Sequence, residues 1–195
     1  MPLTAHPGML AGRGAPYYSA LPLLTDGEVF FVHNGRGSNN NDGRDPLRPR
    51  ASIASAEGLV RATRGDIIVA LEGHVETITA AAGLVFDTAG VKLVGLGWGA
   101  TRPQINFTTA VGADIDIDAA SIWIENVLFT GGIDALTGPI DVNAADFSLI
   151  GCEWRDNTGQ VTDFLVADAN ADRLLIDGLR YVGGLTAGSA ASGTS

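Results

Sequence analysis

Three carboxylates occupy alternate positions of one short segment, Asp114, Asp116 and Asp118, with an isoleucine after each of the first two. Alternation with a period of two residues is typical of a β-strand, so all three side chains are expected on one face. Carboxylate oxygens are the ligands that Ca²⁺ prefers, although the ion needs about six to eight of them. A calcium site and a solvated strand face both fit this pattern. We favour the solvated face and predict no metal site.

A second pair suited to proton transfer is His74 and Glu76, two positions apart. The neighbouring sequence supplies no nucleophile or metal ligand to work with such a pair. We interpret His74 as a histidine whose hydrogen bonds are satisfied in the core or in a cap. Cys152 is the one cysteine of the chain, which excludes an internal disulfide, and we interpret it as a small core residue. The sequence therefore predicts no catalytic residue and no cofactor.

The elements that would position these residues come from a degenerate repeat. Five rows begin at Val69, Val91, Ile122, Phe147 and Leu174, at spacings of 22, 31, 25 and 27 residues. Each row has two alternating apolar residues, then Gly or Asn, then another apolar residue. Four rows end in an aromatic residue, and this column is predicted to stack along one edge of the core: Trp98, Phe129, Trp154 and Tyr181. A repeat of this length is typical of a solenoid.

The columns of the repeat predict its local structure. Alternation predicts a strand, the Gly or Asn predicts a corner with positive φ, and the next apolar residue predicts a second strand that turns inward again. A strand, a corner and a strand describe one coil of a parallel β-helix. A helical solenoid needs apolar residues at i, i+3, i+4 and i+7, and the rows lack that period.

Composition limits the possible classes of protein. The chain has 195 residues, of which 46% are hydrophobic and 17% charged, and its net charge is −10. This is enough apolar material for a core of about one domain. The negative charge argues against nucleic-acid binding and against attraction to an anionic membrane. No apolar run approaches the roughly 18 residues of a membrane span, and residues 1–27 do not have the order of a secretory signal.

The chain divides into four segments. Residues 1–27 contain four prolines and are predicted to form an extended N-terminal arm. Its predicted interface residues are Tyr17, Tyr18, Leu21 and Leu23. Residues 28–64 are predicted to cap the solenoid with a strand over 28–33, a loop, and a helix over 50–63. Residues 65–184 form the coils. Residues 185–195 are of low complexity and are predicted to be a flexible C-terminal tail or a second docking arm.

Two segments of the sequence resemble a known class of proteins. Residues 30–43 and 65–78 resemble the N-terminal entry of right-handed parallel β-helix proteins of the pectate-lyase-like class, and 65–103 looks most like small β-helix proteins encoded by tailed phages. The resemblance implies an all-β fold: a short, right-handed, single-stranded parallel β-helix of about five coils, with an N-terminal capping helix and extended terminal arms. Enzymes of the class use Asp-bound Ca²⁺ and an outward Arg or Lys. We find no matching set here.

One outward strip of the coils is predicted to be an interface. Trp123 lies between inward residues and therefore faces outward, next to Lys92, Ser148 and Leu175 in the stacked rows. Val94 and Ile150 occupy outward positions one step further on. The strip of Trp123, Val94, Ile150 and Leu175 is too apolar for a free sheet face. Tryptophan can stack on sugar, but the flanking aliphatic residues favour subunit packing.

These features lead us to expect a non-enzymatic structural protein of a phage particle, made in the host cytoplasm. The leading hypothesis is a capsid decoration or cement protein, a homotrimer that binds the major capsid protein and spans capsomers with its arms. The alternative is a tail-associated spike or fibre component that binds host glycan, with weak glycan-cleaving activity. A groove combining Trp123 with outward Asp and Arg residues, or two carboxylates about 5–9 Å apart, would favour the alternative.

Overall fold

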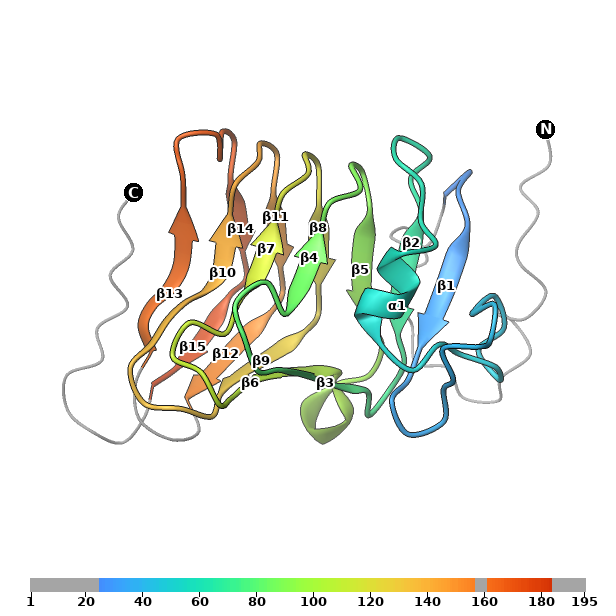
Figure 1. Ribbon diagram of the computed structural model, residues 1–195, viewed down its shortest axis with the longest axis horizontal. Helices are drawn as coiled ribbons and strands as arrows, with labels where there is room; N and C mark the ends of the chain where they lie inside the picture. Colours follow the sequence, from blue (N-terminus) through green and yellow to red (C-terminus); the bar gives the residue numbers. More distant parts are fainter. Residues whose placement is uncertain (1–24, 157–160, 184–195) are drawn as a thin grey trace.

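The repeated rows form three parallel sheets in the computed structural model, which describes residues 25–156 and 161–183 (Figure 1). Sheet 1 contains β1 (Val29–Val32), β2 (Ile67–Ala70), β5 (Lys92–Gly95), β8 (Trp123–Glu125), β11 (Ser148–Ile150) and β14 (Leu175–Asp177). Sheet 2 contains β3 (Val75–Ile78), β6 (Gln104–Phe107), β9 (Leu128–Gly131), β12 (Glu153–Asp156) and β15 (Arg180–Val182). Sheet 3 contains β4 (Leu84–Phe86), β7 (Ile115–Ile117), β10 (Leu136–Val142) and β13 (Val161–Ala167).

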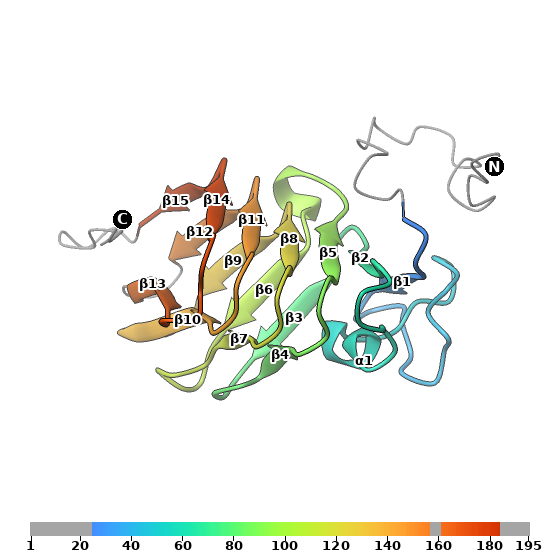
Figure 2. The ribbon, with the colours of Figure 1, turned by 90° about the horizontal axis from the view of Figure 1, so that it is seen from above.

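The chain visits the three sheets in turn, so each circuit is one coil of a parallel β-solenoid (Figure 2). The complete coils are β2–β4, β5–β7, β8–β10 and β11–β13, and β14 and β15 begin another. The described fold is therefore a solenoid of about four turns, somewhat shorter than the five coils expected from the sequence.

The core follows from the register of these strands. Leu93, Ile124, Leu149 and Ile176 are stacked partners on the inner face of sheet 1. One apolar cluster runs from Phe30 in the first strand to Trp154 and Val161 near the last coil. Inside it, the ring centroid of Phe107 lies 6.5 Å from that of Phe129 and 5.9 Å from that of Trp154. The coils are thus joined by one continuous core.

The corners after sheet 1 have the predicted conformation in most rows. The φ angles are 74° at Gly73, 55° at Asn126, 57° at Gly151 and 65° at Gly178. The amide Nδ2 of Asn126 also donates to the carbonyl oxygens of Gly95 (2.8 Å) and Gly97 (2.9 Å). Asn therefore replaces Gly here because it tolerates positive φ and closes the corner of the preceding coil.

The second row differs from the prediction. Gly95 is not the left-handed residue. Instead, a Cβ there would lie 2.3 Å from the carbonyl oxygen of Asn126, so the close approach of two coils requires the glycine. Gly97 has positive φ, 100°, within an excursion that contains the short 3-10 helix η2 (Gly99–Thr101). Trp98 lies on this excursion and is 79% exposed, so its predicted place in the inner aromatic column is wrong.

The predicted N-terminal capping helix over 50–63 is not supported. Residues 50–63, all of which the structure describes, contain only α1 (Ile53–Glu57), a helix of five residues with Ser52 as its N-cap. Gly58 ends the helix soon after it begins, because glycine favours a helix end over a helix interior. Ile53 and Ala56 still reach the core. No helix within the described ranges is long and apolar enough to cross a membrane. The predicted arm and tail lie almost wholly outside those ranges.

Candidate interaction surfaces

The outer face of sheet 1 carries the strip that the sequence predicted. Lys92, Trp123, Ser148 and Leu175 are consecutive partners in the ladder, as expected from the rows. The next outward ladder is Val94, Glu125, Ile150 and Asp177. Acidic residues therefore alternate with the apolar ones in this second ladder, a feature that the prediction of an apolar strip did not include.

Trp123 is held by its own neighbours. The Lys92 ammonium nitrogen lies 5.6 Å from the centroid of the Trp123 ring, a cation–π arrangement. The indole Nε1 donates to the Glu125 carboxylate at 3.1 Å. Trp123 and Ile150 are half-buried, while Leu175 is 47% exposed. The accessible part of the strip therefore lies over β8, β11 and β14.

Val94 belongs to a different environment. It is 6% exposed and packs in a second apolar cluster on the outer face, together with Phe31, Ile67, Val69 and Leu71. Val29 and Leu96 pack against this cluster. Val94 therefore adds little to the accessible surface of the strip. The other predicted interface residues, Tyr17, Tyr18, Leu21 and Leu23, lie outside the described residues.

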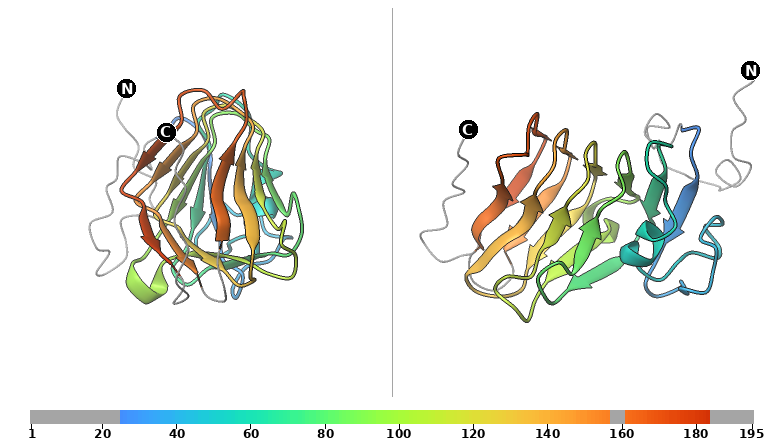
Figure 3. Two further views of the ribbon diagram at one scale, coloured as in Figure 1. Left: turned by 90° about the vertical axis from the view of Figure 1, so that its left-hand side faces the viewer. Right: turned by 45° about the horizontal axis from the view of Figure 1, so that its top comes forward.

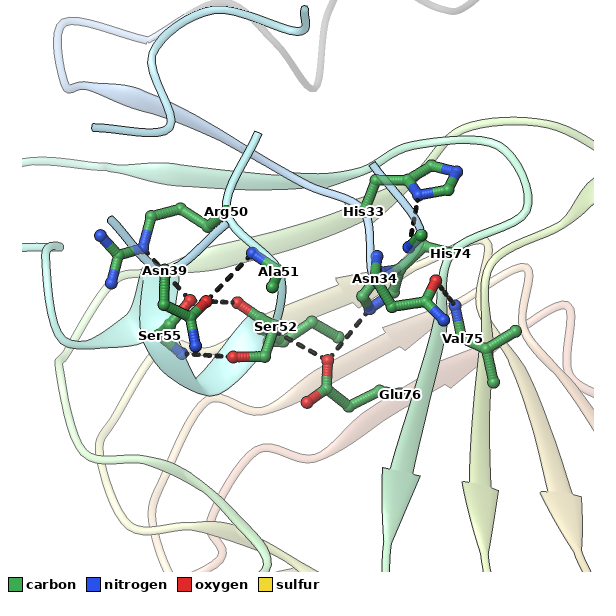
Figure 4. A network of polar contacts seen from close by, with 12 residues as sticks. His33, Asn34, Asn39, Arg50, Ala51, Ser52, Ser55, His74, Val75 and Glu76 are labelled. Carbon is green, nitrogen blue, oxygen red and sulfur yellow. Dashed lines mark hydrogen bonds and ion pairs between the residues drawn. The ribbon is translucent and has the colours of Figure 1, made fainter. Parts of the chain in front are cut away.

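His74 and Glu76 come together in a polar network at the entry to the coils (Figure 4). His74 is fully buried, and its Nδ1 accepts from the backbone N–H of Asn34 at 3.1 Å. Its Nε2 must then carry the proton, which it donates to the Glu76 carboxylate at 3.0 Å. The same carboxylate oxygen accepts from the backbone N–H of Ile53 at 2.8 Å. The pair therefore joins β3 to α1 and to the loop after β1.

The neighbouring side chains extend the network around the loop after β1. The Asn34 side-chain oxygen accepts from the backbone N–H of Val75 at 3.0 Å. The Nδ1 of His33 accepts from the backbone N–H groups of Gly35 (3.0 Å) and Arg36 (3.2 Å). Partial burial, followed by the charge of Arg36, lowers the pKa of His33. The network is made of satisfied structural bonds, in agreement with the interpretation of His74 from the sequence.

The alternating carboxylates lie on the outer face of sheet 3. Asp116 pairs in register with Asp141 of the next coil. Asp118 accepts from the Asn143 amide at 3.0 Å, and Asp114 accepts from the backbone N–H of Ala82. Burial, followed by repulsion from Asp114, Asp118 and Asp141, raises the pKa of Asp116 to about 6. Within residues 25–156 and 161–183, no group of His, Cys, Asp or Glu has the geometry of a metal site.

Sheet 2 presents a charged cluster that the sequence analysis missed. Glu153 is 5% exposed, and its carboxylate meets three arginines. The distances are 3.4 Å to Arg102 Nη1, 3.0 Å to Arg155 Nε and 3.7 Å to Arg180 Nη1. Burial acts to raise the pKa of Glu153, but the three arginines hold it below its usual range. Beside this cluster, Thr130 accepts from Gln104 and donates to Asn106, both at 3.0 Å.

Part of this charged cluster could have been predicted from the repeat. Glu153 follows Gly151 by two positions, as Arg180 follows Gly178, so the rows place the two residues in one column. Opposite charges in one column of a parallel ladder are expected to pair. Arg102 could not be found in this way, because it comes from the excursion between β5 and β6.

Comparison with known proteins gives a likeness of fold. No family model and no curated protein matches the chain. A solved structure of a rhamnogalacturonan lyase is similar, with a TM-score of 0.54 and 13% identity. The match covers 80% of this chain and 51% of that chain, so this protein spans about half the length of the structure that it resembles. At this identity the likeness supports the parallel β-helix fold.

Proposed function

We propose that this protein is a non-enzymatic structural component of a phage particle, a capsid decoration protein that binds the major capsid protein. The observation that carries the proposal is the outer face of sheet 1. Trp123, Ile150 and Leu175 come from three successive coils on this face. Successive strands are about 4.8 Å apart, so the three side chains, which belong to two adjacent ladders, form a fixed patch suited to a large, rigid partner.

The filled core supports a role that depends on surfaces. Residues of the inner ladders, such as Leu93, Ile124, Leu149 and Phe129, are fully buried among themselves. A partner would then contact residues on the outside of the coils, which the buried core holds in place. We further propose a homotrimer, by analogy with other phage β-helices, with residues 1–27 and 185–195 as arms that reach neighbouring capsomers.

Binding to purified capsids tests this proposal. The double variant Trp123→Ser, Leu175→Ser should lose most binding, because contact residues of this size at an interface contribute about 1–2 kcal/mol or more each. The matched control is Val166→Ser, since Val166 is 41% exposed and lies on the outer face of sheet 3. Equal binding by the double variant and the control would contradict the proposal. Quantitative mass spectrometry of particles should give many copies per head; a few copies on the tail would also contradict it.

A second candidate function is a tail-associated component that binds an acidic glycan. The specific observation is the cluster on sheet 2, where Arg102, Arg155 and Arg180 surround one carboxylate beside a row of hydrogen-bonding side chains. Three guanidinium groups against one carboxylate leave an excess of positive charge, and Arg is well suited to carboxylate recognition. The name of the similar structure, a rhamnogalacturonan lyase, suggests the probe.

Rhamnogalacturonan binding, measured by calorimetry, tests this candidate. Arg155→Gln should weaken binding by a factor of about ten, corresponding to one charge-assisted contact. Arg48→Gln removes the same charge from an exposed position of the loop before α1 and serves as the control. A matched incubation followed by ultraviolet absorbance would report cleavage through an unsaturated product. Binding that is absent, or insensitive to Arg155, would exclude this candidate.

A further inference from the structure

The last coil leaves the core ladder open. Ile176 occupies the same ladder as Ile124 and Leu149, which are fully buried, yet Ile176 is 41% exposed. Other residues of β13 and of this last coil pack against the core and remain partly accessible: Phe164, Leu165, Leu174, Leu179 and Tyr181. The C-terminal end of the solenoid is therefore a partly exposed apolar face. Figure 3 (left) shows this end facing the viewer.

Within residues 25–156 and 161–183, the last strand of each sheet at this end has a neighbouring strand on one side only. These terminal strands are β14, β15 and β13, in sheets 1, 2 and 3. The edge of a terminal strand beside an apolar surface is a template for another strand. This end has both properties of a protein-binding edge.

The core at the opposite end of the solenoid is covered, although β3 and β4 are terminal strands of their sheets there. There β1 extends sheet 1 beyond β2, and α1 packs on β1, β2 and β4 with Ile53 and Ala56 in the core. Glu76 accepts from the first N–H of this helix and fixes it to β3. Because α1 covers the core at this end, there is among the described residues no second apolar end face on which the open C-terminal face of another copy could stack head to tail. The only other surface of this kind is the C-terminal end face of a second copy of the chain.

We propose that the C-terminal end of the solenoid binds a second copy of the chain, tail to tail, around a twofold axis through β14. This axis makes each contact antiparallel: β14 meets β14 of the copy, and β15 meets β13 of the copy. Antiparallel pairs have well-formed hydrogen bonds. A twofold contact of this kind is closed, so it gives pairs and not fibres.

The charges at the rim are compatible with this arrangement. β15 carries Arg180, which is exposed, and β13 carries Asp163. The twofold axis sets the strand with the arginine against the strand with the aspartate, twice in each pair. Residues 184–195, which follow this end in the sequence, contain one large apolar residue, Leu185. They offer little apolar surface with which to cover the face.

Mass measurement by light scattering tests the proposal. Ile176→Asp places a charge in the centre of the contact, so the mass of the assembly should fall by a factor of about two relative to the parent protein. This holds for a single pair or for two trimers joined end to end, because the twofold contact doubles either unit. Leu47→Asp is the matched control, since Leu47 is 82% exposed in the loop before α1. Circular dichroism checks that the variants are folded.

Crosslinking gives a second measurement that does not depend on a disruptive substitution. Cys152 is 1% exposed and burial raises its thiol pKa to about 12, so it is expected to stay unreacted. Asp177→Cys places a reactive thiol on β14, and a short bismaleimide should then give covalent pairs. Asp42→Cys, in the loop after β1, should give none.

The outcomes separate the alternatives. The proposal is overturned if the parent protein and Ile176→Asp have the same mass, or if Asp177→Cys and Asp42→Cys crosslink alike. A third variant lacks residues 184–195. If the parent protein shows no doubling and this deletion causes association, the tail covers the end face in place of a second copy, and the proposal is wrong.

Discussion

At the scale of single residues, the carboxylates of sheet 3 oppose folding at neutral pH. Asp116 faces Asp141 across one strand spacing, with Asp114 and Asp118 on the same side. Burial, followed by repulsion from the neighbouring carboxylates, raises the pKa of Asp116 and of Asp141. The network around Asp118 and Asn143 gives some compensation through a hydrogen bond. The cluster is therefore a source of pH dependence in the stability of the protein.

The substitution Asp116→Asn should stabilise the protein at neutral pH. The carboxyl titrates near 3.9 in an unfolded chain and at about 6 in the folded one. The stability that this group contributes is therefore fully present below about pH 4 and is lost as the pH rises through about 6. Asn mimics the protonated form, so the variant should gain roughly 0.5–1 kcal/mol at neutral pH, a value reduced because solvent screens a half-exposed group.

Thermal unfolding at pH ~5 and pH ~7.5 checks this expectation. The gain of the Asn variant should be larger at the higher pH. Asp26→Asn changes the charge by the same amount at an exposed position outside sheet 3 and should show no such dependence. A gain that is equal at both pH values would mean that Asp116 is not coupled to its neighbours.

Asn126 combines two roles, which two substitutions can separate. Asn126→Gly keeps the positive φ but loses the bonds to Gly95 and Gly97, and should cost about 1–2 kcal/mol. Asn126→Ala also forces an alanine into the left-handed region and should cost about 2–4 kcal/mol. Urea unfolding measures both. Equal losses would show that the corner does not depend on the φ of this residue.

At the scale of elements, the short helix α1 depends on a strand residue for its position. The carboxylate of Glu76 accepts from both Ile53 N–H and His74 Nε2. In Glu76→Ala both donors lose their partner in a largely buried site, and the expected loss is about 2–3 kcal/mol. Thr77→Ala, on the same strand but exposed, should cost much less.

Hydrogen exchange localises this effect. The amide of Ile53 and those of the loop after β1 should exchange faster in Glu76→Ala, while the amides of β8 and β11 should keep their protection. Uniform loss of protection along the chain would instead mean that the network stabilises the whole molecule and not its entry.

The strand ladders of the coils are the elements that the sequence predicts well. The ladder that joins Leu93, Ile124 and Leu149 follows from alternation and row spacing alone, because register in a solenoid repeats from coil to coil. Trp98 was misplaced because a row pattern cannot show where extra residues leave the coil. The helix over 50–63 was overestimated because its alanines favour helix, whereas Gly58 ends α1 and Val60 packs in the core without it.

The surfaces were less predictable than the core. The alignment of Lys92, Trp123 and Leu175 in one ladder follows from the rows, but the burial of Val94 requires knowledge of what lies over a sheet face. The Glu153 cluster draws Arg102 from an irregular segment, and no periodic pattern encodes such a contact. The periodic pattern thus predicts the repeated strands and their inward residues. The contacts on the outer surface depend largely on segments that do not repeat.

At the scale of the whole molecule, the coils share one core and should unfold together. Phe129 is fully buried in a middle coil and stacks near Phe107. Phe129→Ala should cost about 3–5 kcal/mol, and circular dichroism and tryptophan fluorescence should still report one coincident transition. Phe164→Ala, at a partly buried position in the last complete coil, should cost less. Two separate transitions would show that the coils unfold independently.

The excursion between β5 and β6 has a consequence for how the sequence of such a chain can evolve. Eight residues, 96–103, fill a corner that two residues, 126–127, fill in the next coil, yet Gln104 still pairs in register with Leu128. Extra chain at this corner is therefore absorbed without a shift in the ladder. Insertions should be inherited here more readily than at any strand, and a foreign peptide grafted beside Trp98 should be displayed on an intact solenoid.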